Sequence, residues 1–389
     1  MAVIFFNCAV MFAVVNVLAW PVETWLRHRD EIMVEIPVRT RYPDVSLPTA
    51  YPGFTDSEID NILRETWSRT HEYEPFTQHR ERAFTGKYVN VDAHGFRRSQ
   101  HEPWPPSEHD PTVFLFGGST TFGWGLPDDQ TIGYYLAEEL KRRLGHPIVI
   151  YNFGRGYYYS SQERALFAEL LAKGHTPDLA IFVDGLNDFV LTRPAYTRQL
   201  SRTMNGERNS VGLAERLPAL QLVKRAIKNS PETGVTSGIE VLDKPLDSSE
   251  LEKIDYILNR YEHNRKLIEG MAAKYDVEVI FSWQPVPVFK YNLENHPFKT
   301  GGGAWMRQCG AITRAGYARL EQSLEGDSGN RNMLWLADMQ LNLNEPLYVD
   351  QHHYTAKMSA RIASAIADRI ESKGVFHNRP EAGAGLNRP

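Results

Sequence analysis

The sequence contains only two cysteines, Cys8 and Cys309, among its 389 residues. Two thiols exclude a disulfide framework and a cysteine-based zinc site, so cysteine usage indicates no redox compartment. Basic residues are not in excess either, because 43 Lys and Arg stand against 48 Asp and Glu, for a formal charge of −5. A broad cationic surface is therefore not expected, and nucleic acid is not among the predicted partners.

What remains is an ordinary globular composition. The chain is 42% hydrophobic, 11% aromatic and 23% charged, which excludes disorder, collagen-like repeats or coiled coil as the overall description. Its length suits two or three domain-sized units, or one large α/β domain with attached segments.

One segment has the character of a membrane span. Met1 to Trp20 carries no charge, and its clearly polar side chains are Asn7 and Asn16. A helix needs about 20 apolar residues to cross the hydrocarbon core. We predict an anchor or signal segment over residues 1–22. A cleaved signal peptide and a buried soluble helix are the alternatives, and the positive n-region of a signal peptide is missing.

The next part of the chain, residues 23–110, is rich in proline, arginine and aromatic residues. It has no long periodic run apart from a short helix expected over 57–68. Residues 84–91 alternate as a strand does and precede a turn at Gly95. We expect an N-terminal extension that packs on the main domain.

The main domain is predicted over residues 111–374. Strands are expected at 112–116, 147–152, 178–183, 277–283 and 333–337. Helices are expected at 132–144, 162–173, 251–274, 307–323 and 355–372, with Gly145 and Gly174 in helix-ending positions. This alternation predicts an α/β fold with a five-stranded parallel sheet and helices on both faces. Residues 191–249 interrupt the rhythm as a variable insertion, and a disordered tail is expected over 375–389.

Chemically active side chains follow four of these strands. Ser119 lies in a glycine-rich turn after the first strand, and Gly154 and Gly156 follow the second. Asn187 comes after the third, and the Asp-x-x-His sequence of Asp350 and His353 follows the fifth. In open α/β sheets the site lies beyond the carboxyl ends of the strands, so these groups are expected to meet.

Together these residues form an inventory for acyl transfer. Ser119 is the predicted nucleophile, His353 its general base and Asp350 the group that orients the imidazole. The backbone amides of Ser119 and Gly156 and the carboxamide of Asn187 are the expected oxyanion donors. This chemistry requires no metal, and no cofactor is predicted.

The four blocks resemble those of the SGNH hydrolase superfamily, the GDSL-type esterases and lipases. Ser119, a glycine of the 152–156 loop, Asn187 within Gly-x-Asn-Asp, and His353 occur in the order of that name, over roughly residues 112–373. The resemblance implies a flavodoxin-like three-layer α/β/α sandwich with the site residues named above.

Two departures from the family pattern stand out. The usual Gly-Asp-Ser is Gly117-Gly118-Ser119 here, a GGST variant of the first block. In the second block the family's glycine stands some five residues after the asparagine, where this chain has Tyr157. Gly154 and Gly156 therefore both remain candidates for the donor, with Gly156 preferred.

Other interpretations of single residues stay open. The glycines after the first strand lack the spacing of a nucleotide-binding loop. Ser119 alone could be a helix cap, and His352 beside His353 could suggest a metal. The run from Tyr157 to Tyr159 fits packing, with a carbohydrate-stacking rim as the alternative.

The resulting hypothesis is a serine hydrolase that removes an ester-linked acyl group from a carbohydrate or lipid-like substrate through an acyl-enzyme. An O-acyltransferase acting on an envelope or exported polysaccharide is one alternative, and a catalytically inactive membrane-anchored binding protein is another. The expected partners are an ester substrate and the membrane, and the oligomeric state is left open. The resemblance favours a catalytic domain on the periplasmic side, whereas Arg27 and Arg29 after the apolar run favour the cytoplasm.

Overall fold

The protein was analysed as a computed structural model. It describes residues 1–32, 38–39, 42, 45–100, 102–107, 109–205, 217–228, 243, 245–299, 310–325 and 331–376. These residues fall into two compact units. One comprises residues 1–37 and 196–235, and the other comprises residues 38–195 and 236–389.

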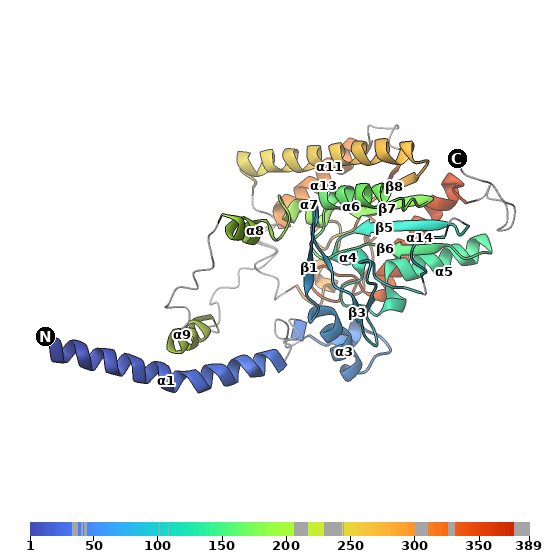
Figure 1. The fold of residues 1–389 in the computed structure, drawn as a ribbon. Helices are drawn as coiled ribbons and strands as arrows, with labels where there is room; N and C mark the ends of the chain where they lie inside the picture. Colours follow the sequence, from blue (N-terminus) through green and yellow to red (C-terminus); the bar gives the residue numbers. More distant parts are fainter. Residues whose placement is uncertain are drawn as a thin grey trace. The chain divides into compact units, whose positions relative to one another are not determined.

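The larger unit is built on a five-stranded parallel sheet. Its strands are β5 (Thr112–Gly117), β6 (Val149–Asn152), β7 (Leu179–Asp184), β8 (Glu278–Trp283) and β9 (Met333–Trp335). They lie in the order β6-β5-β7-β8-β9, and each neighbouring pair is parallel (Figure 1). This is the 2-1-3-4-5 order of flavodoxin-like sheets, so the predicted fold class is confirmed.

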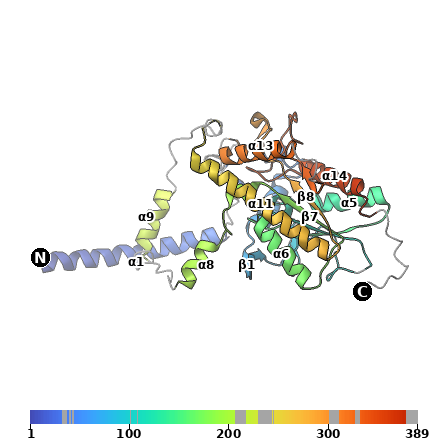
Figure 2. The ribbon, with the colours of Figure 1, turned by 90° about the horizontal axis from the view of Figure 1, so that it is seen from above.

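Helices cover both faces of this sheet. One face carries α6 (Ser160–Ala172), α11 (Ser248–Lys274) and α13 (Ala311–Glu325), and in the view from above α11 runs beside α6 (Figure 2). The other carries α5 (Ile132–Leu144) and α14 (Ala356–Lys373), which pack together. Buried side chains alternate along β5, with Phe114 facing the first group and Leu115 the second. Fully buried strands of this kind suit a sheet covered on both faces.

The helix boundaries agree closely with those expected from the sequence. Gly145 and Gly174 have φ values of 79° and 81°, the left-handed conformation that ends a helix, at the ends of α5 and α6. The start of the helix predicted at 307–323 lies outside the described residues. The predicted tail 375–389 is described only to residue 376, and Phe376 is buried in the core rather than disordered.

The N-terminal extension has more regular structure than the sequence suggested. It contains η1 (Leu47–Thr49), α3 (Asp56–Trp67), and a hairpin of β1 (His71–Glu74) and β2 (Gln78–Glu81) that was not predicted. Helix α3 begins with a capping box between Thr55 and Glu58, where a helix was expected.

The single strand predicted over residues 84–91 is wrong. The segment instead forms two antiparallel two-residue strands, β3 (Phe84–Thr85) and β4 (Asn90–Val91). Between them, the carboxylate of Glu65 accepts the N–H groups of three successive residues, 87 to 89, at 2.8 to 3.0 Å. These bonds bend the chain into a turn, which the alternation of residue types does not encode.

Short elements lie at the carboxyl edge of the sheet. They are α4 (Ser119–Phe122), η2 (Asp128–Gln130), α7 (Leu186–Val190) and η4 (Leu293–Asn295). Two of them, α4 and α7, directly follow strands β5 and β7, so their first residues lie where the sequence placed the candidate site.

The smaller unit contains the apolar N-terminal helix α1 (Ala2–Ile32), α8 (Thr197–Met204) and α9 (Pro218–Lys228). Residues Ala2–Trp25 of α1 form a candidate membrane span with a mean hydropathy of 2.3. Helix α9 packs on α1, and the N–H of Ala219 donates to Asn16 Oδ1 at 3.3 Å. The insertion predicted at 191–249 therefore contains two helices in its described part.

Candidate active site

The turn after β5 presents Ser119 as the first residue of α4. Two glycines precede it, and each is required by close packing. A Cβ at Gly117 would lie 2.1 Å from Thr121 Oγ1, and a Cβ at Gly118 would lie 2.5 Å from Asn187 Nδ2. Both distances are far below van der Waals contact. The glycines therefore allow the serine turn to lie directly against the neighbouring loop.

The structure brings Ser119, His353 and Asp350 into one chain of hydrogen bonds. Ser119 Oγ lies 2.8 Å from His353 Nε2, and His353 Nδ1 lies 2.6 Å from Asp350 Oδ2. The serine and the histidine are 234 residues apart in the sequence. The parallel sheet brings them together, because β5 and β9 end at the same edge and the two residues follow these strands.

The environment of Asp350 keeps its carboxylate ionised. Burial by itself would raise its pKa, but the imidazole of His353 and the backbone N–H groups of His352 and His353 hold the pKa well below the usual carboxyl range. An ionised Asp350 binds the Nδ1–H of His353, which leaves Nε2 as the acceptor for the Ser119 hydroxyl proton. Trp124 stacks on the imidazole with 6.1 Å between ring centroids.

Asn187 lies beside this chain on α7. Its Nδ2 donates to the backbone oxygen of Tyr158 at 2.6 Å and packs against Gly118, next to the serine. The backbone N–H of Ser119 is the first amide of α4, and the first amides of a helix have no acceptor within that helix. These two groups can therefore both act as donors toward an oxygen atom bound near Ser119 Oγ.

The glycine candidates of the second block are placed differently. The N–H of Gly156 donates to Glu81 Oε1 at 2.9 Å, and the N–H of Gly154 donates to Asn152 Oδ1 at 2.9 Å. Both amides already have an acceptor within the protein. The expected role of Gly156 as an oxyanion donor does not fit this arrangement, and Gly154 does not replace it.

Residues of the N-terminal extension that were not predicted from the sequence also contact the site. The guanidinium of Arg97 is fully buried and pairs with Asp128 at 2.7 Å. It also donates to the backbone oxygens of Phe122 and Gly123 at 3.3 Å and of Leu126 at 2.8 Å. Arg97 thus holds the turn that follows Ser119. No local motif marks this arginine, because its partners lie 25 to 31 residues away.

Three acidic side chains are buried beneath the Asn187 turn, namely Glu163, Asp184 and Asp188. Ser160 Oγ donates to Asp188 Oδ1 at 2.6 Å, and Arg260 Nη2 lies 3.4 Å from the same oxygen. Burial raises the pKa of all three carboxyls, and the repulsion between them raises those of Glu163 and Asp184 well above the usual range. Glu163 and Asp184 therefore remain protonated where an exposed carboxyl would be ionised.

The surroundings of Tyr157 to Tyr159 and of His352 bear on the alternative roles considered for them, namely carbohydrate stacking and metal binding. Tyr158 and Tyr159 are buried, as packing residues are, whereas Tyr157 is 49% exposed. The His352 ring contacts that of His353 at an interplanar angle of 45°, and the backbone N–H of His352 donates to Asp350. Within the described part of the chain, no three His, Cys, Asp or Glu side chains lie close enough to share a metal ion.

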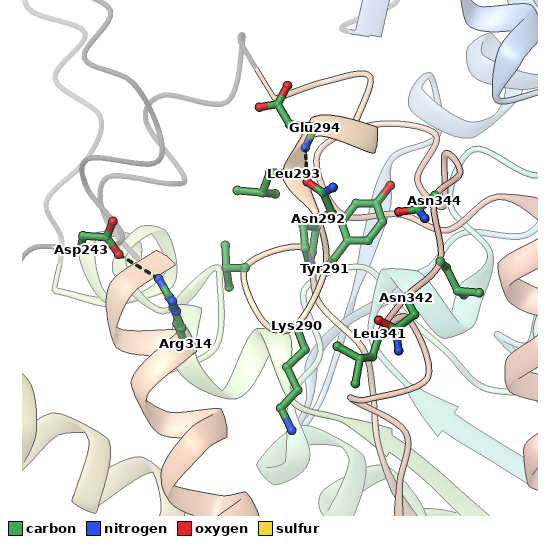
Figure 3. A pocket seen from close by; sticks show the side chains of 13 residues that line it. Asp243, Lys290, Tyr291, Asn292, Leu293, Glu294, Arg314, Leu341, Asn342 and Asn344 are labelled. Carbon is green, nitrogen blue, oxygen red and sulfur yellow. Dashed lines mark hydrogen bonds and ion pairs between the residues drawn. The ribbon is translucent and has the colours of Figure 1, made fainter.

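A separate hollow of about 650 Å³ lies in the larger unit (Figure 3). Its lining comes from the segment after β8, from residues 341–344, and from Arg314, which pairs with Asp243 at 3.1 Å. None of Ser119, Asn187, Asp350 and His353 contributes to it. The hollow is therefore distinct from the serine site.

Comparisons with known proteins give only distant similarities. No family model and no curated protein matches the chain. Among solved structures, a GDSL-like lipase from Bacteroides thetaiotaomicron is 13% identical, with a TM-score of 0.34, over 71% of this chain and 93% of that one. The esterase EstA from Pseudoalteromonas sp. is 11% identical, with a TM-score of 0.32, over 68% and 98%. An acetyl xylan esterase is 14% identical, with a TM-score of 0.33, over 67% and 99%.

The buried acids generate a prediction about pH. A Glu163→Gln variant should gain stability relative to the wild type as the pH rises from about 4, the ordinary glutamate pKa. Above that pH the unfolded wild type releases a proton that the folded state retains, so its folding becomes progressively less favourable. Urea unfolding at pH 5, 6.5 and 8 measures the difference. Glu252→Gln, at an exposed position on α11, is the control. A Glu163→Gln difference that does not change with pH would contradict the assignment.

Proposed function

We propose that this protein is a serine esterase of the SGNH hydrolase superfamily. The observation that carries the proposal is the continuous hydrogen-bonded chain from Asp350 through His353 to Ser119, at 2.6 and 2.8 Å. Such a chain supplies an activated nucleophile, a general base and the group that orients the base. The order of the four sequence blocks on a flavodoxin-like sheet supports the same superfamily.

The proposed reaction proceeds through an acyl-enzyme. Ser119 Oγ attacks the ester carbonyl carbon while His353 Nε2 takes the hydroxyl proton. The tetrahedral intermediate then collapses, the bond to the alcohol oxygen breaks, and His353 returns the proton to the departing alcohol. A water molecule, deprotonated in turn by His353, attacks the acyl-serine. The bond between the acyl carbon and Ser119 Oγ then breaks, the carboxylic acid is released, and His353 returns the proton to Ser119 Oγ. Asp350 stabilises the imidazolium in both halves.

The proposed oxyanion hole has two donors, the N–H of Ser119 and the carboxamide of Asn187. Donors placed in advance stabilise charge that develops only in the transition state, and one donor is typically worth about 3 kcal/mol. Gly156 is left out, because its N–H binds Glu81. The substrate we infer is an acyl ester of a carbohydrate or lipid-like molecule. Helix α1 supports a location at a membrane, where such envelope substrates occur.

Replacing the nucleophile tests the mechanism directly. Ser119→Ala should lower kcat on short acyl p-nitrophenyl esters by about a million-fold, because the attacking group is removed. Folding should be unaffected, since the hydroxyl lies on a partly exposed turn. Ser323→Ala, an exposed serine on α13, is the control and should remain active and react with a fluorophosphonate probe. Retained turnover in purified Ser119→Ala protein would contradict the mechanism. Acyl transfer to an added carbohydrate, in place of acid release, would identify an acyltransferase.

The role of Asn187 is tested by the way in which kinetic constants change. Asn187→Ala should lower kcat by about a hundred- to a thousand-fold with little change in KM, because the carboxamide acts mainly on the developing oxyanion. Steady-state kinetics on the same esters provide both constants. A raised KM with unchanged kcat would instead identify Asn187 as a substrate-binding residue.

We also propose that α1 anchors the protein, with the catalytic domain on the periplasmic side. An apolar helix of this length satisfies its backbone groups within hydrocarbon. After carbonate extraction the full-length protein should stay in the membrane fraction, and added protease should digest its domain in intact spheroplasts. Full-length protein in the soluble fraction would refute the anchor. Complete protection of the domain would place it in the cytoplasm.

A further inference from the structure

The loop after β6 is held from outside the sheet by the β1–β2 hairpin. The hairpin binds both backbone polar groups of Gly156, which belong to the two peptide units on either side of it. Glu81 Oε1 accepts the Gly156 N–H at 2.9 Å, and His79 Nε2 donates to the Gly156 oxygen at 2.8 Å. Both hairpin side chains are buried. Besides the backbone bond from Arg155 N–H to the oxygen of Gly117 at 3.0 Å, this loop is therefore held by residues about 75 positions earlier in the chain.

Glu81 is suited to hold an amide strongly. Its carboxylate is 1% exposed and also contacts Arg69 Nη1 at 3.1 Å and His71 Nε2 at 3.2 Å. Burial alone would raise its pKa, but these partners lower the pKa to about 2, so the group is ionised at neutral pH. Hydrogen bonds to an ionised acceptor are about twice as strong as those between neutral groups.

The same hairpin also binds the loop at Arg155 and Tyr158. Arg155 Nη1 donates to Tyr158 Oη at 2.8 Å and pairs with Glu74 of β1. The Tyr158 hydroxyl in turn donates to the backbone oxygen of His79 at 2.5 Å. Between the bound residues Gly156 and Tyr158, Tyr157 has a φ of 64°, a conformation that bulky residues rarely adopt. Such a conformation persists when the surroundings impose it.

A hydrogen bond joins this loop to the Asn187 side of the proposed oxyanion hole. The backbone oxygen of Tyr158 accepts one hydrogen of the Asn187 carboxamide, with 2.6 Å between the heavy atoms. A carboxamide carries two hydrogens in a single plane. When Tyr158 binds one of them, the direction of the other is set as well.

We infer that the β1–β2 hairpin is a positioning element of the active site, in which Glu81 and His79 fix the 154–158 loop so that Tyr158 orients Asn187 toward the oxyanion. This inference rests on the proposed function. It assigns a catalytic contribution to the N-terminal extension, although neither Glu81 nor His79 touches the reacting atoms. Both are positioning residues, and their effect should pass through Asn187.

A double-mutant cycle on the full-length protein tests this path. The variants are Glu81→Gln, Asn187→Ala and the double variant, with Glu72→Gln as the control. Glu72 lies on the same hairpin but pairs with Arg80 at 2.6 Å. The readouts are kcat and KM on a short acyl p-nitrophenyl ester, together with the free energy of unfolding in urea.

The inference predicts that Glu81→Gln lowers kcat by about 10- to 100-fold, with KM changed less than about twofold, since small displacements of a catalytic group are costly. In the Asn187→Ala background the same change should lower kcat less than about threefold, because residues that act as a unit are not additive. Glu72→Gln should stay within about twofold of the wild type. Losses that multiply in the double variant, or a loss of stability with kcat unchanged, would overturn the inference.

A second variant covers the case in which Glu81→Gln does not fold. His79→Phe keeps an aromatic ring in the same space and removes the bond to the Gly156 oxygen. It should show the same kcat loss and the same dependence on Asn187, and a wild-type kcat would count against the hairpin. The Ser119→Ala variant distinguishes failure of the proposed function from failure of the positioning role. Activity that survives Ser119→Ala refutes the proposed function. Activity that requires Ser119 but does not change when Glu81 or His79 is replaced refutes only the positioning role.

Discussion

Buried backbone N–H groups outside helices and strands need acceptors, and in this protein side-chain carboxylates supply them at the points that matter most for the site. Glu65 binds three successive amides of the extension, Glu81 binds Gly156, and Asp350 binds the amides of His352 and His353. Each bond is charge-assisted, so each irregular segment is held more firmly than neutral turns would hold it. The loops around Ser119 depend on these carboxylates for their shape.

A consequence is that the sheet alone does not make the site. The parallel strands bring the serine, the asparagine and the histidine to one edge, but the turn after Ser119 and the loop after β6 are also held by the N-terminal extension. Arg97 binds the turn after Ser119, and the β1–β2 hairpin binds the loop after β6. From residue 38 onward, the extension is thus part of the same structural unit as the site.

Two groups of buried carboxyls near the same edge have pKa values shifted in opposite directions, because their partners differ. Asp350 is buried against an imidazole and two amide donors, which stabilise its charge and lower its pKa. Glu163 and Asp184 are buried with Asp188, and repulsion from neighbouring carboxylates adds to the effect of burial, so their pKa values rise. The local partners therefore decide which acids are ionised beside Ser119 and which keep a proton beneath Asn187.

The sequence by itself determined the order of strands and helices, because alternating buried strands and amphipathic helices leave a period that survives in the residue pattern. It also identified Ser119, Asn187, Asp350 and His353 as candidates, because each follows a strand that ends at the same edge. The turn at residues 87–89, the pairing of Glu81 with Gly156 and the burial of Arg97 were decided only in the tertiary structure. Those contacts join residues 22 to 75 positions apart. Long-range hydrogen bonds of this kind leave no periodic signal in the chain, so only the folded arrangement shows which partners each of these side chains binds.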